Sequence, residues 1–361
     1  MQSMRRACES FLRGETTGPF WALLRWPLIP LGLCFGELAA FRLWLYQRGH
    51  LNSEDPGIRV ISVGNLVTGG TGKTPFVRLL AEMLLAMRER PLILGRGYGA
   101  RDETGSLDEE GRSFQRDLPG VPVLQNGDRL GELRRYLESS EAPTVILLDD
   151  GAQHRKIRRD VEIILVDATC PFGSGWPIPA GSLREFPGAL RRSDLVVVTR
   201  SDEVDPVELH ALVSRIERMT AHGPVILARH VAARLMPGSE SPNHLEGRDV
   251  FLASGIAHPA SFRKLVRSIG AGIAGHAEYP DHHDFRPEDL VRIEQAARAS
   301  QAEMIVATGK DEPKIAPRVG DGELPWRFLE VDIDLVADGA ATLERIVAEG
   351  ESRGPASHQV S

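Results

Sequence analysis

The sequence is poor in cysteine and aromatic residues and has no surplus of basic charge. Its 361 residues include three widely separated cysteines, Cys8, Cys34 and Cys170. They give neither a disulfide framework nor a zinc-ligand spacing, and they fit a reducing compartment. Lys and Arg number 43 against 50 Asp and Glu, a net charge of -7, which excludes a protein-wide basic field for nucleic acid. Aromatic residues make up 6%, so the core must rest mainly on aliphatic side chains.

A long charge-free hydrophobic run is also missing. The most apolar segment, residues 21–46, has its longest uncharged stretch from Trp26 to Gly36, whereas a spanning helix needs about 20 mostly apolar residues. The segment lacks the short charged start and small-residue cleavage site of a signal peptide. Leucine and aromatic residues flanked by arginine favour a helix in a membrane interface. A helix packed on the protein's own core is the alternative.

The rest of the chain has the pattern of an α/β protein. Short apolar runs alternate with helical or polar stretches, which is typical of a parallel sheet covered on both faces. We expect strands in residues 58–65, 91–97, 144–151, 162–168, 194–200, 225–231, 249–257 and 303–312. Residues 101–120 are polar and predict a surface loop or hairpin flap.

The length predicts two domains. We place a membrane-docking helical segment at 1–50, a first α/β domain at 51–235, a smaller C-terminal α/β domain at 236–349, and a flexible tail at 350–361.

The strongest motif is SVGNLVTGGTGKTPF, residues 62–76. It follows an expected strand and precedes an expected helix, which is the context of a phosphate-binding P-loop. Backbone N–H groups of such a loop and the helix N-terminus bind phosphate oxygens. Lys73 would contact the β- and γ-phosphates, and the hydroxyl of Thr74 would bind Mg²⁺. The expected nucleotide-binding residues are Gly69, Gly70, Thr71, Gly72, Lys73 and Thr74.

A pair of carboxylates follows another expected strand. Asp149 and Asp150 end the run VILLDDG, in the position where P-loop proteins hold Mg²⁺ directly or through water. We expect Asp149 to be a metal ligand and Asp150 to serve catalysis, although either could be the direct ligand. The basic run from Arg155 to Arg159 is by default a solvated helix face, and anion binding is its functional alternative.

Nine segments in order resemble the tetraacyldisaccharide 4'-kinase family. They are GNLVTGGTGKTP (64–75), RGYGAR (96–101), NGD (126–128), LLDDGAQHR (147–155), IPAGSLRE (178–185), RRSDLVVVTR (191–200), GIAHPASF (255–262), PDHHDF (280–285) and TGKDEPK (308–314). The resemblance covers nearly the whole chain. It implies a P-loop kinase domain with a smaller C-terminal α/β domain, and transfer of phosphate from ATP, with Mg²⁺, to the 4'-hydroxyl of tetraacyldisaccharide 1-phosphate, a lipid A precursor.

The resemblance also implies residue roles. Asp128 and His282 match the aspartate and histidine associated with deprotonation of the sugar hydroxyl, with His283 as the other choice. Lys73 and Asp150 complete the expected catalytic set. The substrate-binding candidates are Arg96, Gln153, His154, Arg184 and Glu185. Arg129 follows Asp128 where the family usually has glutamate, which puts a metal or phosphate contact there in doubt.

Location and partners follow from the resemblance together with the composition. We expect a monomer that docks on the cytoplasmic face of the inner membrane of a Gram-negative bacterium and binds no nucleic acid. The alternative is a membrane-docked P-loop GTPase or ATPase switch, because TRSD at 199–202 resembles the guanine-reading box of GTPases. A non-catalytic ATP-dependent partitioning protein is a further alternative.

Overall fold

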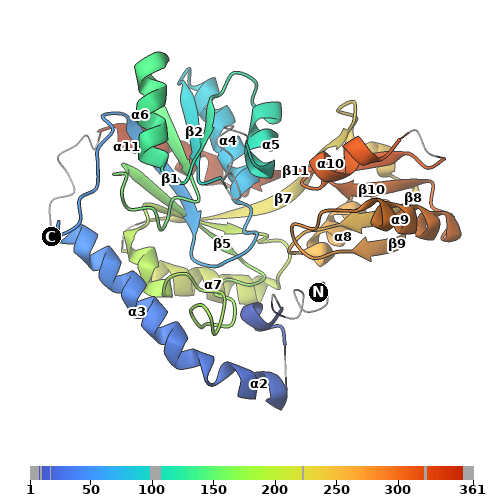
Figure 1. Ribbon diagram of the computed structural model, residues 1–361, viewed down its shortest axis with the longest axis horizontal. Coiled ribbons are helices and arrows are strands. Elements are labelled where there is room, and N and C mark those ends of the chain that lie inside the picture. Colours follow the sequence, from blue (N-terminus) through green and yellow to red (C-terminus); the bar gives the residue numbers. More distant parts are fainter. Residues whose placement is uncertain are drawn as a thin grey trace. The chain divides into compact units, whose positions relative to one another are not determined.

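The computed structural model describes residues 8, 10–16, 18–97, 107–221, 223–320 and 323–352. The chain divides into two compact units. We call Arg6–Arg229 with Leu335–Ser361 the P-loop unit and His230–Asp334 the C-terminal unit. Strand β7 (Val225–Met236) leads the chain out of the P-loop unit, and β11 (Trp326–Leu335) leads it back (Figure 1). The chain divides within β7, between Arg229 and His230, whereas the division was expected between 235 and 236, and residues 335–349, expected in the C-terminal domain, lie in the P-loop unit.

The P-loop unit is built on a parallel sheet, in the order β3-β2-β4-β1-β5-β6-β7. Its other strands are β1 (Arg59–Asn65), β2 (Pro91–Gly95), β3 (Val123–Gln125), β4 (Val145–Asp149), β5 (Val161–Asp167) and β6 (Leu195–Thr199). Its helices are α2 (Pro19–Arg25), α3 (Leu28–Gln47), α4 (Lys73–Ala86), α5 (Glu109–Asp117), α6 (Arg129–Ser139), the 3-10 turn η1 (Pro187–Arg192), α7 (Pro206–Glu217) and α11 (Gly339–Ser352). The expected α/β class with a parallel sheet is confirmed.

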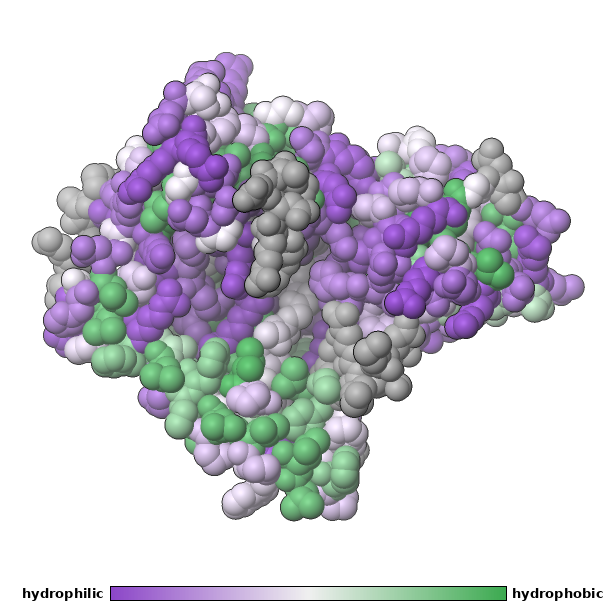
Figure 2. All heavy atoms as spheres, viewed as in Figure 1, coloured by the Kyte–Doolittle hydropathy of each residue, from purple (hydrophilic) through white to green (hydrophobic). Residues whose placement is uncertain are grey.

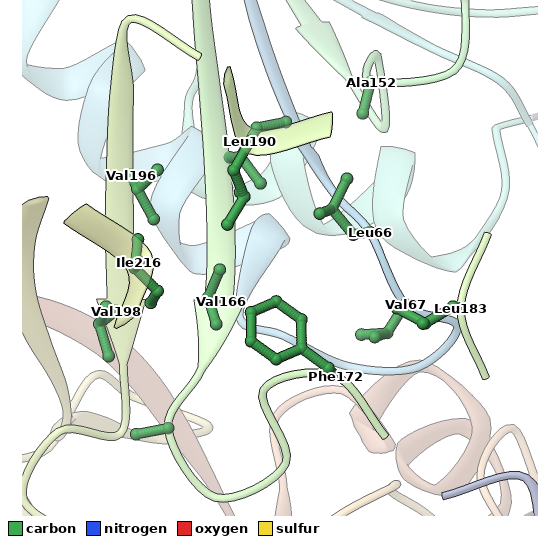
Figure 3. Packing of buried hydrophobic residues seen from close by; sticks show 12 residues of the cluster. Leu66, Val67, Ala152, Val166, Phe172, Leu183, Leu190, Val196, Val198 and Ile216 are labelled. Carbon is green, nitrogen blue, oxygen red and sulfur yellow. The ribbon is translucent and has the colours of Figure 1, made fainter. Parts of the chain in front are cut away.

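Apolar side chains cover this sheet in separate clusters. One joins Val60, Ile146 and Leu148 of the strands to Leu133 of α6. Another joins strands β5 and β6 to α7 through Val166, Val196 and Ile216, and Figure 3 shows these side chains packed together. Burial on both faces explains why the strands are continuous apolar runs without alternation.

The C-terminal unit repeats this layout on a smaller scale. Its strands have the order β7-β11-β10-β8-β9, with parallel pairs β8–β9, β8–β10 and β10–β11. Its elements after β7 are η2 (Pro242–Leu245), β8 (Asp249–Ser254), α8 (Pro259–Ser268), β9 (Gly272–Glu278), α9 (Pro287–Ala299), β10 (Met304–Thr308), α10 (Glu312–Ile315) and η3 (Ala316–Arg318), followed by β11. Two buried apolar clusters belong to this unit.

Part of the expected loop at 101–120 is helical. Residues 101–106 lie outside the described chain, but Glu109–Asp117 form α5. The carboxylate of Asp108 caps this helix by accepting a hydrogen bond of 2.9 Å from the N–H of Gly111. An N-terminal cap of this kind satisfies a backbone donor that helix formation leaves free. The polar composition was therefore misleading, because it belongs to a capped surface helix.

The N-terminal apolar segment forms two helices whose large side chains face outward. In α3 the buried residues are Gly32 and Gly36. The exposed large hydrophobic residues of this surface are Phe20, Leu23, Leu24, Trp26, Leu31, Leu33, Phe35, Leu38, Phe41 and Trp44. Figure 2 shows hydrophobic residues gathered over α2 and α3. By length and composition, α3 is long and apolar enough to cross a membrane.

Candidate active site

The P-loop connects β1 to α4. Gly69 and Gly72 have φ angles of 116° and 86°, in a region that only glycine adopts without strain. Gly72 caps α4, so Lys73 and Thr74 open the helix. All six expected nucleotide-binding residues therefore lie in this turn or in the first turn of α4.

Two residues at the end of β6 donate hydrogen bonds to backbone carbonyl groups of the P-loop and support its conformation. The hydroxyl of Thr199 donates to the carbonyl oxygen of Thr71 at 3.0 Å. The guanidinium of Arg200 donates to the carbonyl oxygen of Gly70 at 3.2 Å and pairs with the carboxylate of Asp167. The first half of TRSD, which resembled a guanine-reading box, thus supports the P-loop backbone through Thr199 and Arg200.

Asp150 lies among cations. Its Oδ1 is 3.7 Å from the ammonium nitrogen of Lys73, and one guanidinium nitrogen of Arg184 lies 2.9 Å from each carboxylate oxygen. Burial alone would raise the pKa of Asp150, but the charges of Lys73 and Arg184 outweigh it and hold the pKa below its usual value. The sequence-predicted residues Lys73, Asp150 and Arg184 are therefore brought together.

Asp149 has a different environment. It ends β4, opposite Val63 of β1 in the parallel register. The side chain is buried, and its Oδ1 has no hydrogen-bond partner. Burial, followed by the negative charge of Glu110, raises the pKa of Asp149 to about 7. A buried carboxylate oxygen without a donor is costly, and a cation would satisfy it.

Glu110 was missed by sequence reasoning. Its Oε1 accepts a hydrogen bond of 3.3 Å from the hydroxyl of Thr74, which places a further carboxylate beside the residues expected to bind the metal. The available signal was the acidic start of α5, Asp108–Glu109–Glu110, within a segment taken for a loop. The described residues contain no group of three or more His, Cys, Asp or Glu able to hold a metal by themselves.

Arg184 belongs to a network of side-chain hydrogen bonds. Gln153 donates to the carboxylate of Glu185 at 2.7 Å and accepts from Arg184 at 3.3 Å. Glu185 also pairs with Arg192 at 2.8 Å. Three expected substrate-binding residues, Gln153, Arg184 and Glu185, are thus neighbours, but Glu185 and Gln153 serve largely to orient one another and Arg184.

The basic run after Asp150 is not a helix face. Arg155 and Arg159 approach the buried carboxylate of Glu162 at 2.9 and 3.7 Å, and Arg192 approaches it at 3.2 Å. The anion that Arg155 and Arg159 face is therefore a carboxylate of the chain itself. These arginines hold β5 to the segment that follows β4.

Asp128 lies after β3 and caps α6. Its carboxylate accepts a 3.3 Å hydrogen bond from the N–H of Gly131, and it lines an open pocket of about 310 Å³ with His154 and Lys156. The neighbouring Arg129 is buried and donates to the carbonyl oxygen of Asp149 at 2.9 Å. Arg129 therefore braces the end of β4. Arg96 is exposed directly after β2.

His154 is held neutral. Burial, with the nearby charges of Arg129 and Arg159, lowers its pKa to about 4. Its Nε2 is buried without a hydrogen-bond partner. A neutral ring in such a position can accept or donate one hydrogen bond to a bound molecule.

The C-terminal unit distinguishes the two adjacent histidines. The side chain of His282 is 51% exposed, and its Nε2 lies 3.4 Å from the ammonium of Lys310, which pairs with Asp281 at 2.8 Å. His283 is buried, bonded to Asp289 at 2.8 Å and stacked on Tyr279 with ring centroids 4.5 Å apart. His283 therefore has a packing role, and His282 is the accessible candidate.

Comparisons with known proteins agree with these features. The family profile described as Tetraacyldisaccharide-1-P 4'-kinase matches residues 24–349. The Tetraacyldisaccharide 4'-kinase of Anaeromyxobacter dehalogenans (strain 2CP-C) is 37% identical over 356 residues, covering 92% of this chain and 93% of that protein. The corresponding protein of Syntrophus aciditrophicus (strain SB) is 37% identical over 317 residues, covering 80% and 83%.

A solved structure is also similar. LpxK from Aquifex aeolicus, crystallised in complex with ATP, is 30% identical and has a TM-score of 0.68, covering 90% of this chain and 99% of that one. The expected resemblance is confirmed along the chain, in both sequence and fold: this protein belongs to the tetraacyldisaccharide-1-P 4'-kinase family.

Proposed function

We propose that this ATP-dependent tetraacyldisaccharide 4'-kinase carries out phosphoryl transfer at the carboxyl edge of the P-loop sheet, with the residue roles given below. The activity itself follows from family membership. The observation that supports the residue assignment is the placement of Lys73 and Arg184 on the carboxylate of Asp150, beside the P-loop. Phosphoryl transfer depends mainly on positioning and charge neutralisation, which these groups supply.

The nucleotide phosphates occupy the P-loop. Backbone N–H groups from Gly69 to Gly72 and the N-terminus of α4 bind the phosphate oxygens. Lys73 shifts from Asp150 to the β- and γ-phosphates as they bind. The braces from Thr199 and Arg200 keep the loop backbone in its binding conformation before ATP arrives.

Magnesium fits the oxygen atoms beside Thr74. Thr74, Asp149 and Glu110 would hold it, because Asp149 offers a buried, unsatisfied oxygen and Glu110 lies within hydrogen-bond distance of Thr74. Mg²⁺ prefers such oxygen ligands and usually shares them with substrate phosphates and water. When bound, it neutralises charge on the β- and γ-phosphates.

Two carboxylates compete for the role of proton acceptor. The family resemblance gives the role to Asp128, with His282 as the supporting histidine. A second assignment is Asp108, because Asp108 and Glu109 form the aspartate–glutamate pair typical of the family motif, whereas Asp128 is followed by arginine. The pair also precedes Glu110, which contacts Thr74. Either carboxylate would act as a general base on the sugar hydroxyl.

The lipid substrate approaches along the membrane surface. We propose that α2 and α3 dock on the cytoplasmic face of the inner membrane with their exposed apolar side chains, as a peripheral or monotopic anchor. This places the P-loop unit at the bilayer, where an acylated disaccharide resides. We propose that the enzyme works as a monomer at this surface.

A labelled γ-phosphate assay tests the proposed site. Purified protein, detergent, Mg²⁺ and tetraacyldisaccharide 1-phosphate are combined with ATP or, separately, GTP. We expect labelled lipid from ATP and its loss in Lys73→Ala, with an equal amount of Arg191→Ala, altered at an exposed position, as the control. Labelled lipid formed at the normal rate by Lys73→Ala would contradict the assignment, and GTP hydrolysis without labelled lipid would instead indicate a switch.

A further inference from the structure

The apolar helix α3 lies with its backbone directly on one loop of the P-loop unit, residues 176–186. A Cβ added to Gly32 would lie 2.7 Å from the carbonyl oxygen of Pro177, and one added to Gly36 would lie 2.6 Å from Cζ of Phe186. Contacts this short leave no room for any side chain. Because Gly32 and Gly36 are the buried residues of α3, the helix meets the rest of its unit chiefly along this line.

The same loop holds the active site on its other side. The N–H of Thr68 donates to the carbonyl oxygen of Ser182, and the N–H of Arg184 donates to that of Leu66, both at 2.8 Å. Leu183 pairs with Val67 in an isolated antiparallel bridge, and Figure 3 shows their side chains together at the edge of the core. The loop is therefore fixed to the P-loop between its two contacts with α3, at Pro177 and Phe186.

This arrangement gives α3 a second task besides anchoring. The loop forms no long helix or strand between Trp176 and Phe186, so its position depends on packing from both sides. Arg184 reaches Asp150 from this loop. A displacement of α3 therefore acts on the loop that carries Arg184, and displacements of about 1 Å in reacting groups can cost roughly a hundredfold in rate.

We propose that Gly32 and Gly36 of the membrane-docking helix are positioning residues for catalysis, which seat the 176–186 loop so that Arg184 is aligned on Asp150 beside the P-loop. The inference rests on the proposed function, because it takes Arg184 and Asp150 to serve phosphoryl transfer. The helix is then part of the catalytic framework, and its seating on the loop links membrane docking to the geometry of the reacting groups.

Substitution on the two sides of α3 tests this in the full-length protein. Gly36→Leu forces the helix away from Phe186, whereas Cys34→Leu adds the same side chain at an exposed position of the same helix. Leucine has a higher helix propensity than glycine, so loss of the helix would not explain a defect. We measure kcat, KM for ATP, and sedimentation with vesicles of phosphatidylethanolamine and phosphatidylglycerol.

We expect Gly36→Leu to bind vesicles like the unaltered protein but to lose at least roughly tenfold in kcat, with KM for ATP changed much less. Cys34→Leu keeps both properties. Phe186→Ala, which removes the ring that the new side chain meets, restores much of kcat in the Gly36→Leu background. The milder Gly36→Ala shows a smaller loss in the same direction, which keeps the test informative if Gly36→Leu folds poorly.

A double-mutant cycle separates positioning from general damage. If α3 acts through Arg184, Gly36→Leu costs little further kcat in an Arg184→Ala background. Full additivity of the two losses, or a Gly36→Leu protein with normal kcat, overturns the inference. Arg184→Ala on its own tests the proposed function, because normal kcat in that variant would show that Arg184 has no role in catalysis. If Arg184→Ala is impaired but Gly36→Leu has normal kcat, only the coupling of Arg184 to α3 is contradicted.

Discussion

The hydroxyl of Thr74 donates a hydrogen bond of 3.3 Å to the carboxylate of Glu110. This contact joins the first turn of the P-loop helix to the first turn of α5. It brings an acidic residue from a polar surface segment to the side chain expected to bind Mg²⁺.

The first prediction concerns that carboxylate. Glu110→Gln should raise the Mg²⁺ concentration needed for half-maximal activity by roughly 10- to 100-fold, because it removes a charged oxygen from the metal environment. Glu138→Gln, at an exposed position of α6, serves as the control. Binding of Mn²⁺ in the presence of ATP, followed by electron paramagnetic resonance, gives a readout independent of turnover. Unchanged Mn²⁺ affinity would falsify the assignment.

The proton acceptor is decided by a matched pair of substitutions. Asp128→Asn and Asp108→Asn each remove one charge with little change in shape. The variant that lacks the base should lose roughly 10²- to 10⁴-fold in kcat, with nearly normal KM for ATP. A large loss confined to Asp108→Asn moves the role to the start of α5. Normal kcat in both variants excludes both carboxylates.

The adjacent histidines should respond in opposite ways. His283→Ala leaves the carboxylate of Asp289 without its ring partner and should lower the free energy of unfolding by about 1–3 kcal/mol. His282→Ala alters a half-exposed ring and should leave the unfolding midpoint near that of the parent while reducing kcat. Denaturant unfolding and steady-state kinetics measure the two effects. A stable His283→Ala protein that has lost kcat would reverse the assignment.

The P-loop braces predict a specific kinetic defect. Thr199→Val removes the donor to the carbonyl oxygen of Thr71 while preserving side-chain shape, and Arg200→Met removes the donor to Gly70. Both should raise KM for ATP by several-fold, since the loop must then be ordered by the nucleotide itself. Arg191→Ala on the exposed surface is the control. Isothermal titration with ATP measures the affinity directly, and equal affinity in all variants contradicts a bracing role.

His154 gives a pH-dependent prediction. Its pKa in the folded protein is about 4, below the value of about 6.5 in an unfolded chain. The unfolded state therefore binds the proton more readily. The stability that His154 contributes is complete above pH 6.5 and is lost as the pH falls toward 4. His154→Gln should remove roughly 1 kcal/mol of the stability difference between pH 7.5 and 5.0. Thermal unfolding of both proteins at the two pH values measures this difference. An equal stability difference between pH 7.5 and 5.0 in His154→Gln and in the unaltered protein would contradict the prediction.

The sequence predicted most of the strands, because buried parallel strands need continuous apolar runs that are visible in one dimension. Strands β1, β2, β4, β6, β8 and β10 lie within expected runs, and β5 begins one residue before its run, at Val161. Strand β3 was missed because it has three residues, and β9 because Gly272, Gly275 and His276 interrupt its apolar pattern. The helix α5 was missed because its polar composition was taken for that of a loop, and Asp108 was not recognised as its N-terminal cap.

The candidate site was predictable where the chemistry is local in sequence. The P-loop and the Asp149–Asp150 pair each occupy one short segment next to a strand. Glu110 could not be found in the same way, because its approach to Thr74 depends on how α5 packs. The braces from Thr199 and Arg200 were hidden by a stronger sequence pattern, the similarity of TRSD to a guanine-reading box.

Because the chain returns to the P-loop unit through β11, the P-loop unit is completed only after the C-terminal unit has been synthesised. Helix α11 belongs to the P-loop unit, with Val347 buried and its carbonyl oxygen bonded to Arg59 of β1 at 3.2 Å. On the ribosome, the C-terminal unit is synthesised before the last helix that completes the fold around the phosphate-binding strand. A nascent chain that already carries the proposed catalytic residues therefore still lacks part of the core around β1, and loss of α11 would expose the part of β1 that this helix covers.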